Sequence, residues 1–430
     1  MHGLFTRKGL LNLVALVGVQ GGNALVPLLV VPFALAMMGP DAYAKVAIAE
    51  AISAIVLASV LFSFEIDGVA RIAGMRAGND RNALGLALSE IISARLVLFF
   101  AGSIVVLGGY WLLHGSDVGL LALWLLVPFG QIFHSYWFYQ GIENNVPPAV
   151  ITLLSRAVTV AIVVLFIRAP SDQYLLPLAV GAPFAIGGMV STGYLIIVQR
   201  LRVRWAGLSQ VFALLSHGKE VFAGNAAVML YREMNIVILG IIGANAASIA
   251  TYALIEKSIK MLQACTRPLS QLFFPKVLGA LSGERRPTPA IARIIASFTA
   301  PQVMLVALLL AAIPVAYLVA RLIWPQLSLF GDLPQLWLLV AIMAPATVIG
   351  LANFMFGTAG LNYLGERRYY FHVILITGVA SVGASLALSS FLGAVGAAIC
   401  FVGAEALLLI LVLSRYVREV PLETEMRSAS

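Results

Sequence analysis

The chain has 430 residues, of which 61% are hydrophobic and only 11% are charged. Soluble domains carry about 25% charged residues, so this composition excludes a soluble globular protein and predicts an all-α, polytopic membrane protein. The formal net charge of +8 does not indicate a nucleic-acid partner, because most of the excess lies in loops, where it sets the orientation of the chain in a lipid bilayer.

Twelve apolar segments, each long enough to cross a bilayer, follow one another along the chain. The predicted helices span 9–37, 43–64, 83–111, 118–141, 148–168, 174–198, 218–243, 247–277, 290–320, 334–357, 370–391 and 394–415. The first is too long for the apolar part of a signal peptide, so we expect it to be a retained spanning helix. The connections leave no room for a folded extramembrane domain, so any function is expected within the helix bundle.

The basic residues predict the orientation of these helices. With the N-terminus in the cytoplasm, 18 of the 27 Lys and Arg residues fall in inside segments, whereas Lys45, Arg168 and Arg321 fall in outside segments. Cytoplasmic loops carry an excess of Lys and Arg, so this distribution predicts an even number of helices with both termini in the cytoplasm.

A weak internal repeat links the two halves of the chain. The pentapeptide 22–26 (GNALV) resembles 224–228 (GNAAV), and Gly39 and Glu50 then match Gly243 and Glu256. Six predicted helices separate the copies, so both would insert the same way round, as parallel repeats do. We therefore predict two six-helix lobes around a central cavity, 1–204 (helices 1–6) and 205–430 (helices 7–12).

Ionisable residues inside a bilayer are costly and usually face a bundle interior or an aqueous cavity. The acidic residues expected at bilayer depth are Glu50, Glu90, Glu233, Glu256 and Glu405. The candidate substrate-binding residues are basic or amide side chains: Arg95, Arg156, Arg232, Lys257, Lys260, Arg267, Asn225 and Gln263. If their helices converge, they enclose a basic cavity that attracts an anion, and the planar fork of arginine suits phosphate.

The predicted helix 247–277 carries the longest polar stripe. Its members recur every three or four residues: Tyr252, Glu256, Lys260, Gln263, Arg267 and Gln271. This stripe either lines a cavity or forms an ion-pair seam between helices. Shorter polar faces occur on three other helices: Asn12, Gln20 and Asn23; Thr152, Arg156 and Thr159; Asn225, Arg232 and Asn235.

Two further features bear on mechanism. Burial disfavours the charged form of a carboxyl group, so Glu50, Glu256 and Glu405 are candidates for binding a coupling cation, H⁺ or Na⁺. Pro27 and Pro32 each remove a helix hydrogen bond and act either as a gating hinge or as a static kink. No catalytic residue, metal site or cofactor is expected, since Cys and His show no metal-ligand spacing.

Four segments carry a resemblance to a known family. They are 26–40, with its Val-Pro pairs and Gly-Pro exit; 136–143 (YWFYQGIE); 252–257 (YALIEK); and 268–276, from PLSQ to FPK. Together, in this order, they resemble the polysaccharide (O-antigen/Wzx-type) flippase family of the multidrug/oligosaccharidyl-lipid/polysaccharide (MOP) exporter superfamily. Ile255 stands where that family usually has Ala.

The resemblance implies a transporter, not an enzyme, in the bacterial inner membrane. Its substrate would be an undecaprenyl-pyrophosphate-linked oligosaccharide, moved from the cytoplasmic to the periplasmic leaflet by cation-coupled alternating access. A glycan polymerase and a chain-length regulator are candidate partners. One alternative is a drug exporter of the same superfamily, which typically has an acidic residue in helix 1; residues 9–38 contain none. Another is a membrane-embedded glycan polymerase or glycosyltransferase, for which the outer loops are short.

Overall fold

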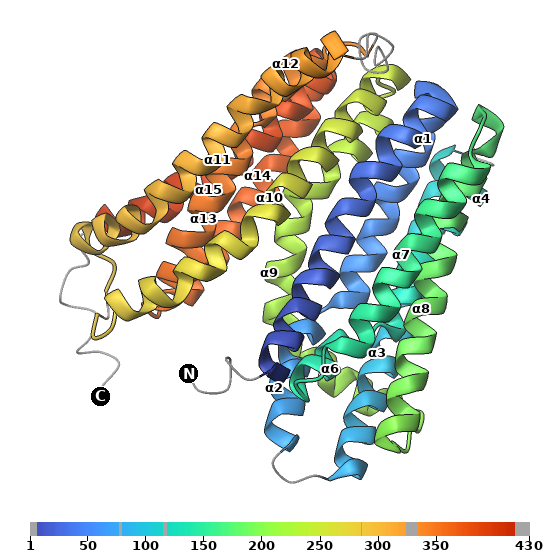
Figure 1. The fold of residues 1–430 in the computed structure, drawn as a ribbon, viewed down its shortest axis with the longest axis vertical. Helices are drawn as coiled ribbons and strands as arrows, with labels where there is room; N and C mark the ends of the chain where they lie inside the picture. The colour runs from blue at the N-terminus through green and yellow to red at the C-terminus, as the bar shows by residue number, and fades with distance from the viewer. Residues whose placement is uncertain (1–6, 77–79, 115–117, 285, 324–332, 418–430) are drawn as a thin grey trace. The chain divides into compact units, whose positions relative to one another are not determined.

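The computed structural model describes residues 7–76, 80–114, 118–284, 286–323 and 333–417. These residues form helices and no strand (Figure 1), which confirms the all-α fold. Within this part of the chain, nine helical segments are long and apolar enough to cross a membrane. The chain is therefore a multi-pass membrane protein. The number of about twelve spanning helices stays a prediction.

The first unit of the chain contains α1 to α9 and much of α10. The helices are α1 (Arg7–Leu61), α2 (Phe64–Arg76), α3 (Arg81–His114), α4 (Gly119–Trp124), α5 (Leu126–Phe133), α6 (Tyr136–Gly141), α7 (Val146–Phe166), the short 3₁₀ helix η1 (Pro170–Tyr174), α8 (Leu175–Gln199), α9 (Leu208–Ile241) and α10 (Ala246–Ala280). α1 contains the first two predicted helices, joined at Gly39, whose φ of 75° is not helical. The predicted helix 118–141 is three short helices, α4 to α6.

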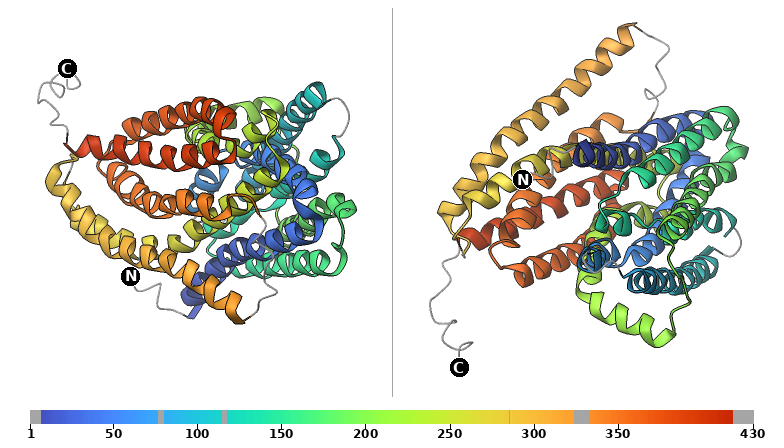
Figure 2. Two further views of the ribbon diagram at one scale, coloured as in Figure 1. Left: turned by 90° about the horizontal axis from the view of Figure 1, so that it is seen from above. Right: turned by 60° about the horizontal axis from the view of Figure 1, so that its bottom comes forward.

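The remaining elements belong to the second unit. They are α11 (Pro289–Ile323), α12 (Leu336–Met343), α13 (Pro345–Asn353), the π-helix η3 (Phe354–Leu361), α14 (Arg367–Leu392) and α15 (Ala394–Val417). The predicted helix 334–357 is divided at Pro345, whose backbone nitrogen has no hydrogen to donate. In this unit α15 packs against α12, α13 and α14 (Figure 2).

By their contacts, residues 1–261 form one unit and 262–430 the other. Because α9 packs against α1 and α3, it belongs to the first unit by this measure. The predicted lobe boundary between 204 and 205 rests on the repeat and stays a prediction. One backbone observation agrees with the repeat. The matched residues Gly39 and Gly243 have φ of 75° and 68°, so each copy has a glycine with positive φ at the matched position.

The core of the first unit holds the polar helices at fixed positions. α7 lies between α1 and α8 (Figure 1), and α3 also packs against α1. At one end, α6 packs against α2, where Trp137, Phe138 and Tyr139 are buried in a large apolar cluster. The segment 136–143 is thus mainly a packing element, with Tyr139 donating a hydrogen bond to the carbonyl of Ser191 at 2.7 Å.

Candidate functional site

Arg156 of α7 and Asn23 of α1 meet inside the first unit. The guanidinium Nε of Arg156 donates a hydrogen bond to the amide oxygen of Asn23 at 3.0 Å. Its plane lies over the ring of Phe184, 4.8 Å from the ring centroid, a distance at which a cation is attracted to the π face. The polar faces predicted for these two helices therefore converge, and one nitrogen of the guanidinium fork is engaged in positioning the group.

A second cation, Lys257 of α10, pairs with Glu50 of α1. The ammonium group donates to Glu50 Oε2 and lies 5.9 Å from the ring centroid of Tyr43. The two charged side chains are only 18% and 32% exposed, so the pair is largely withdrawn from solvent. A pair in such surroundings is screened less than a surface pair, so removing one partner leaves a costly charge.

Both groups line one cavity of the first unit. Its polar lining consists of Asn23, Tyr43, Glu50, Arg156 and Lys257, and apolar side chains of α1, α4 and α8 complete it. The volume of about 80 Å³ admits several water molecules or a phosphate-sized group.

A neighbouring cavity extends this polar interior. Asn23 also lines it, together with Glu65, Tyr136, Gln140 and Asn145, and its volume is about 100 Å³. Pro27 of α1 has no N–H to donate to the carbonyl of Asn23, so this carbonyl lacks the usual helix hydrogen bond from four residues later.

The polar stripe of α10 forms an ion-pair seam in its first half. Lys260 Nζ lies 2.9 Å from a carboxylate oxygen of Glu233 on α9 and 3.5 Å from Glu256. Glu256 is almost completely buried and accepts a hydrogen bond from Tyr252 at 3.3 Å. The seam interpretation therefore describes Tyr252, Glu256 and Lys260. The side chains of Arg267 and Gln271 lie outside the described residues.

Arg95 requires a correction. It is completely buried in α3, with 0% exposure, and its guanidinium donates to the carbonyls of Gln131 and His134 and to Glu65. These hydrogen bonds engage both terminal nitrogens of the guanidinium, and its buried Nε has no partner among the described residues. The structure thus places Arg95 as a cross-link between α2, α3 and α5, and not on a cavity wall.

Three other predicted binding residues, Asn225, Arg232 and Gln263, are not among the side chains that line this cavity. Asn225 of α9 donates its amide to the carbonyl of Phe62 at 3.0 Å, and Arg232 is half-buried on the same helix. Gln263 belongs to the second unit, where its amide donates to the carbonyl of Ala346 at 2.9 Å. Of the shorter stripes, Asn12 and Gln20 have side chains outside the described residues.

Glu405 is the buried carboxylate of the second unit. It is 2% exposed on α15, and Asn353 donates hydrogen bonds to its side chain at 2.8 Å and to its carbonyl at 3.0 Å. Asn353 ends α13 immediately before the π-helix η3, an element often found at functional sites. Each of the three coupling candidates is thus held by a different partner: Glu50 by Lys257, Glu256 by Lys260 and Tyr252, and Glu405 by Asn353.

The predicted hinge prolines lie within continuous helix. α1 keeps helical backbone angles through Pro27 and Pro32, and its non-helical residue is Gly39. Their role in gating therefore stays a prediction.

Sequence reasoning missed three residues near these groups. Tyr43, Glu65 and Phe184 contact Lys257, Arg95 and Arg156 respectively, yet each comes from an element remote in sequence. An aromatic or acidic residue on a different helix has no linear signature that assigns it to a particular buried cation.

Solved structures define the class of this fold. An inward-facing multidrug resistance MATE family transporter of the MOP superfamily matches with a TM-score of 0.64 at 14% identity, covering 94% of both chains. The lipid II flippase MurJ, in an inward closed conformation, matches with a TM-score of 0.63 at 10% identity, covering 94% of this chain and 87% of that one. The chain is thus a multi-pass membrane protein with the fold of MOP-superfamily transporters.

Sequence comparison then gives the family. The model of the polysaccharide biosynthesis protein family matches residues 10–277, and the chain belongs to this family. A protein of Escherichia coli (strain K12) named "Putative O-antigen transporter" is 21% identical over 405 residues, covering 94% of this chain and 95% of that protein. These relatives are named as transporters and flippases, not as enzymes.

Proposed function

We propose that the protein moves an undecaprenyl-pyrophosphate-linked oligosaccharide from the cytoplasmic to the periplasmic leaflet of a bacterial inner membrane, with both of its own termini in the cytoplasm. The observation that carries this proposal is the cavity that Arg156 and Lys257 share with Asn23. Family membership and the name of the Escherichia coli relative support a polysaccharide substrate.

The chemistry of the cavity fits one part of such a substrate. Arg156 is oriented by Asn23 and Phe184, so its remaining N–H donors are preorganised and lose little freedom on meeting phosphate oxygens. Lys257 supplies a second positive charge on the same wall, balanced by Glu50 until an anion arrives. A cavity of about 80 Å³ suits the phosphate group and not the sugar chain, so the glycan would occupy space elsewhere in the protein.

The rest of the mechanism follows as part of the proposal. Alternating access between two six-helix lobes would carry the headgroup across, and exchange for H⁺ or Na⁺ at Glu50, Glu256 or Glu405 would drive it. A glycan polymerase would take the product at the periplasmic face, with a chain-length regulator beside it.

Substitution of Arg156 tests the proposal. Loss of one charge-assisted phosphate contact costs about 1.5–3 kcal/mol, so Arg156→Ala should lower glycan export by about tenfold or more. Arg156→Lys keeps the positive charge but loses the planar fork, so its export should lie between that of Arg156→Ala and that of the unaltered protein. The measurement is surface polysaccharide in a flippase-deficient strain, at matched protein level.

Arg168→Ala is the matched control, because Arg168 is exposed beyond the end of α7. Its export should equal that of the unaltered protein. Full export by Arg156→Ala would contradict the assignment of this cavity as the phosphate-binding site. Resistance to small toxic compounds in an exporter-deficient strain, without restored polysaccharide, would favour the drug-exporter alternative.

A further inference from the structure

The connection between α8 and α9 is an extended strip of chain docked along α3. Small residues at every fourth position form a stripe on α3: Gly85, Ser89 and Ser93. The backbone N–H of Arg204 donates to Ser89 Oγ at 2.9 Å and that of Ala206 to Ser93 Oγ at 3.1 Å. A Cβ at Gly85 would lie 2.6 Å from the carbonyl oxygen of Arg202. The spacing agrees because two residues of extended chain and four residues of α-helix both advance by about 6–7 Å.

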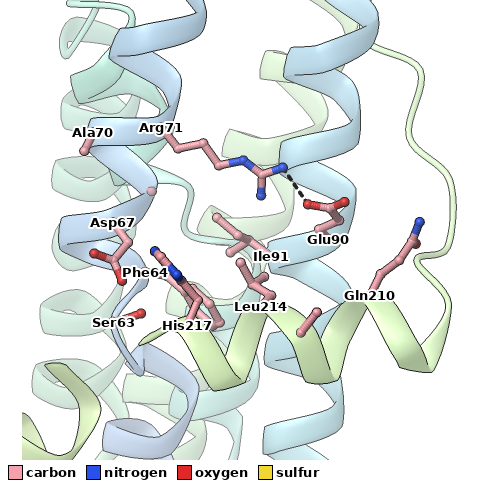
Figure 3. A pocket seen from close by; sticks show the side chains of 12 residues that line it. Ser63, Phe64, Asp67, Ala70, Arg71, Glu90, Ile91, Gln210, Leu214 and His217 are labelled. Carbon is pink, nitrogen blue, oxygen red and sulfur yellow. Dashed lines mark ion pairs between the residues drawn. The ribbon is translucent and has the colours of Figure 1, made fainter. Parts of the chain in front are cut away.

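This docking fixes where α9 begins. The strip leads from the end of α8 along α3 as far as Ser93, and α9 starts two residues later, at Leu208. The first turns of α9, which carry Gln210, Leu214 and His217, run across α2 and α3 and not alongside them (Figure 3). This part of α9 therefore lies across the end of the first unit.

The first turns of α9 have two opposite faces. Leu208 and Phe212, four residues apart, are 59% and 62% exposed, and Trp205 just before them is 65% exposed. The opposite face lines a cavity of the first unit with Gln210, Ala213, Leu214 and His217. Since a helix repeats every 3.6 residues, these two sets lie on opposite sides of the same three turns.

The cavity on that second face is charged. It has a volume of about 600 Å³, and Asp67, Arg71 and Glu90 line it beside His217 (Figure 3). Arg71 and Glu90 form an ion pair of 2.6 Å within it. Charged side chains of this kind are stable when hydrated. The first turns of α9 therefore have one face toward a hydrated cavity and an exposed apolar face on the opposite side.

Three exposed arginines precede the apolar face: Arg200, Arg202 and Arg204. A helix with a large apolar face, a polar face and adjacent basic residues is the type that lies in the interface of an anionic membrane, and tryptophan favours that depth. We propose that residues 200–217 form a membrane-surface anchor. In it, Trp205, Leu208 and Phe212 enter the acyl boundary of the leaflet while the three arginines bind anionic phospholipid headgroups.

Quenching of a fluorophore tests this anchor. Phe212→Cys and His217→Cys, each with Cys265→Ser and Cys400→Ser, are labelled and reconstituted in mixed phosphatidylglycerol and phosphatidylcholine vesicles of one composition; His217 is exposed and lies on the cavity face, opposite Phe212. Bromine is placed on the acyl chains of either lipid. We expect bromolipid to quench the label at 212 and aqueous iodide to quench that at 217. Bromine on phosphatidylglycerol should quench more at 212, with an enrichment of about fivefold, the factor for one basic residue at an anionic surface.

The triple variant R200Q/R202Q/R204Q should remove the preference for phosphatidylglycerol while leaving bromolipid quenching at 212. The control R286Q/R367Q/R368Q removes the same charge from exposed positions elsewhere and should keep the preference. Equal iodide quenching at 212 and 217 overturns the anchor, and so does an unchanged lipid preference in the first triple variant. Quenching at 212 by neither agent would show that a protein surface covers this face, which also overturns it.

The anchor rests on membrane insertion and not on the identity of the substrate. The proposed orientation of the chain sets the side of the membrane on which the anchor lies. A membrane-impermeant maleimide tests this orientation separately on His217→Cys in intact cells. Labelling only after lysis agrees with a cytoplasmic anchor. Labelling of intact cells would reverse the orientation and leave the quenching result to decide the anchor itself.

Discussion

Arg95 and Arg156 both lie inside the first unit, but their guanidinium groups meet different partners. Arg95 has no exposed surface and donates to two backbone carbonyls and to Glu65. Arg156 lines a cavity and has one donor fixed by Asn23. The same residue type therefore serves packing in one case and is available to a ligand in the other.

Substitution by methionine should separate these two roles. Arg95→Met leaves Glu65 and two buried carbonyls without their donor, and breaking a buried ion pair costs about 3–5 kcal/mol. We expect a marked loss of folded protein in the membrane and a lower unfolding temperature. Arg156→Met should keep its level and lose export. The measurements are membrane abundance by size-exclusion fluorescence and export at matched abundance. Normal abundance with lost export in Arg95→Met would return Arg95 to the binding residues.

Among the elements, α2 shows how closely the packing is specified. Gly68 of α2 lies against the indole of Trp137, and a Cβ at this position would be 2.7 Å and 2.9 Å from two ring carbons. Gly141 at the end of α6 lies equally close to Ile72 of α2: a Cβ added at Gly141 would lie 2.6 Å from the Cβ of Ile72. The two glycines allow α2 and α6 to approach each other, and so position the helix end that carries Glu65.

Two alanine substitutions on α2 test this packing. Alanine favours helix over glycine by about 1 kcal/mol, so Gly74→Ala, where nothing lies within 4 Å, should be neutral or stabilising. Gly68→Ala gains the same propensity but overpacks Trp137, and such strain costs about 1–3 kcal/mol. We expect Gly68→Ala to unfold at a lower temperature than Gly74→Ala in detergent. Equal unfolding temperatures would mean that the indole moves aside without cost.

Helix positions were predictable from the sequence, whereas the partners of buried charges were not. Apolar runs such as 148–168 and 394–415 give helices within a few residues of α7 and α15, because length and hydropathy suffice for a spanning helix. The break at Leu125 was missed although Pro128, in the first turn of α5, cannot donate a helix hydrogen bond to Trp124; the break at His134 has no proline beside it. The i, i+4 contact between Glu256 and Lys260 was foreseeable, but the Arg95–Glu65 and Lys257–Glu50 pairs join helices whose packing no local pattern encodes.

For the whole molecule, the open question is how an ion gradient would act on the proposed transport. Three buried or half-buried carboxylates are candidates, and each has a defined neighbour: Lys257 beside Glu50, Lys260 beside Glu256, and Asn353 beside Glu405. A coupling carboxylate must exchange its partner for a cation during the cycle. A structural carboxylate keeps its partner throughout. Neutralising the carboxylate without changing its shape distinguishes the two.

We therefore expect one of Glu50→Gln, Glu256→Gln and Glu405→Gln to move lipid-linked glycan down its own gradient while losing acceleration by an imposed H⁺ or Na⁺ gradient. The assay is enzymatic accessibility of the glycan in vesicles, with and without that gradient. For Glu50 the double variant E50Q/K257M also removes the unpaired ammonium. The double variant lacks the Lys257 charge, so its transport should be slower in either case. If Glu50 only balances Lys257, the remaining transport should still be accelerated by the gradient; if Glu50 binds the coupling cation, the variant should regain abundance without that acceleration. Acceleration equal to that of the unaltered protein in all three single variants would mean that none of these carboxylates couples transport to the gradient.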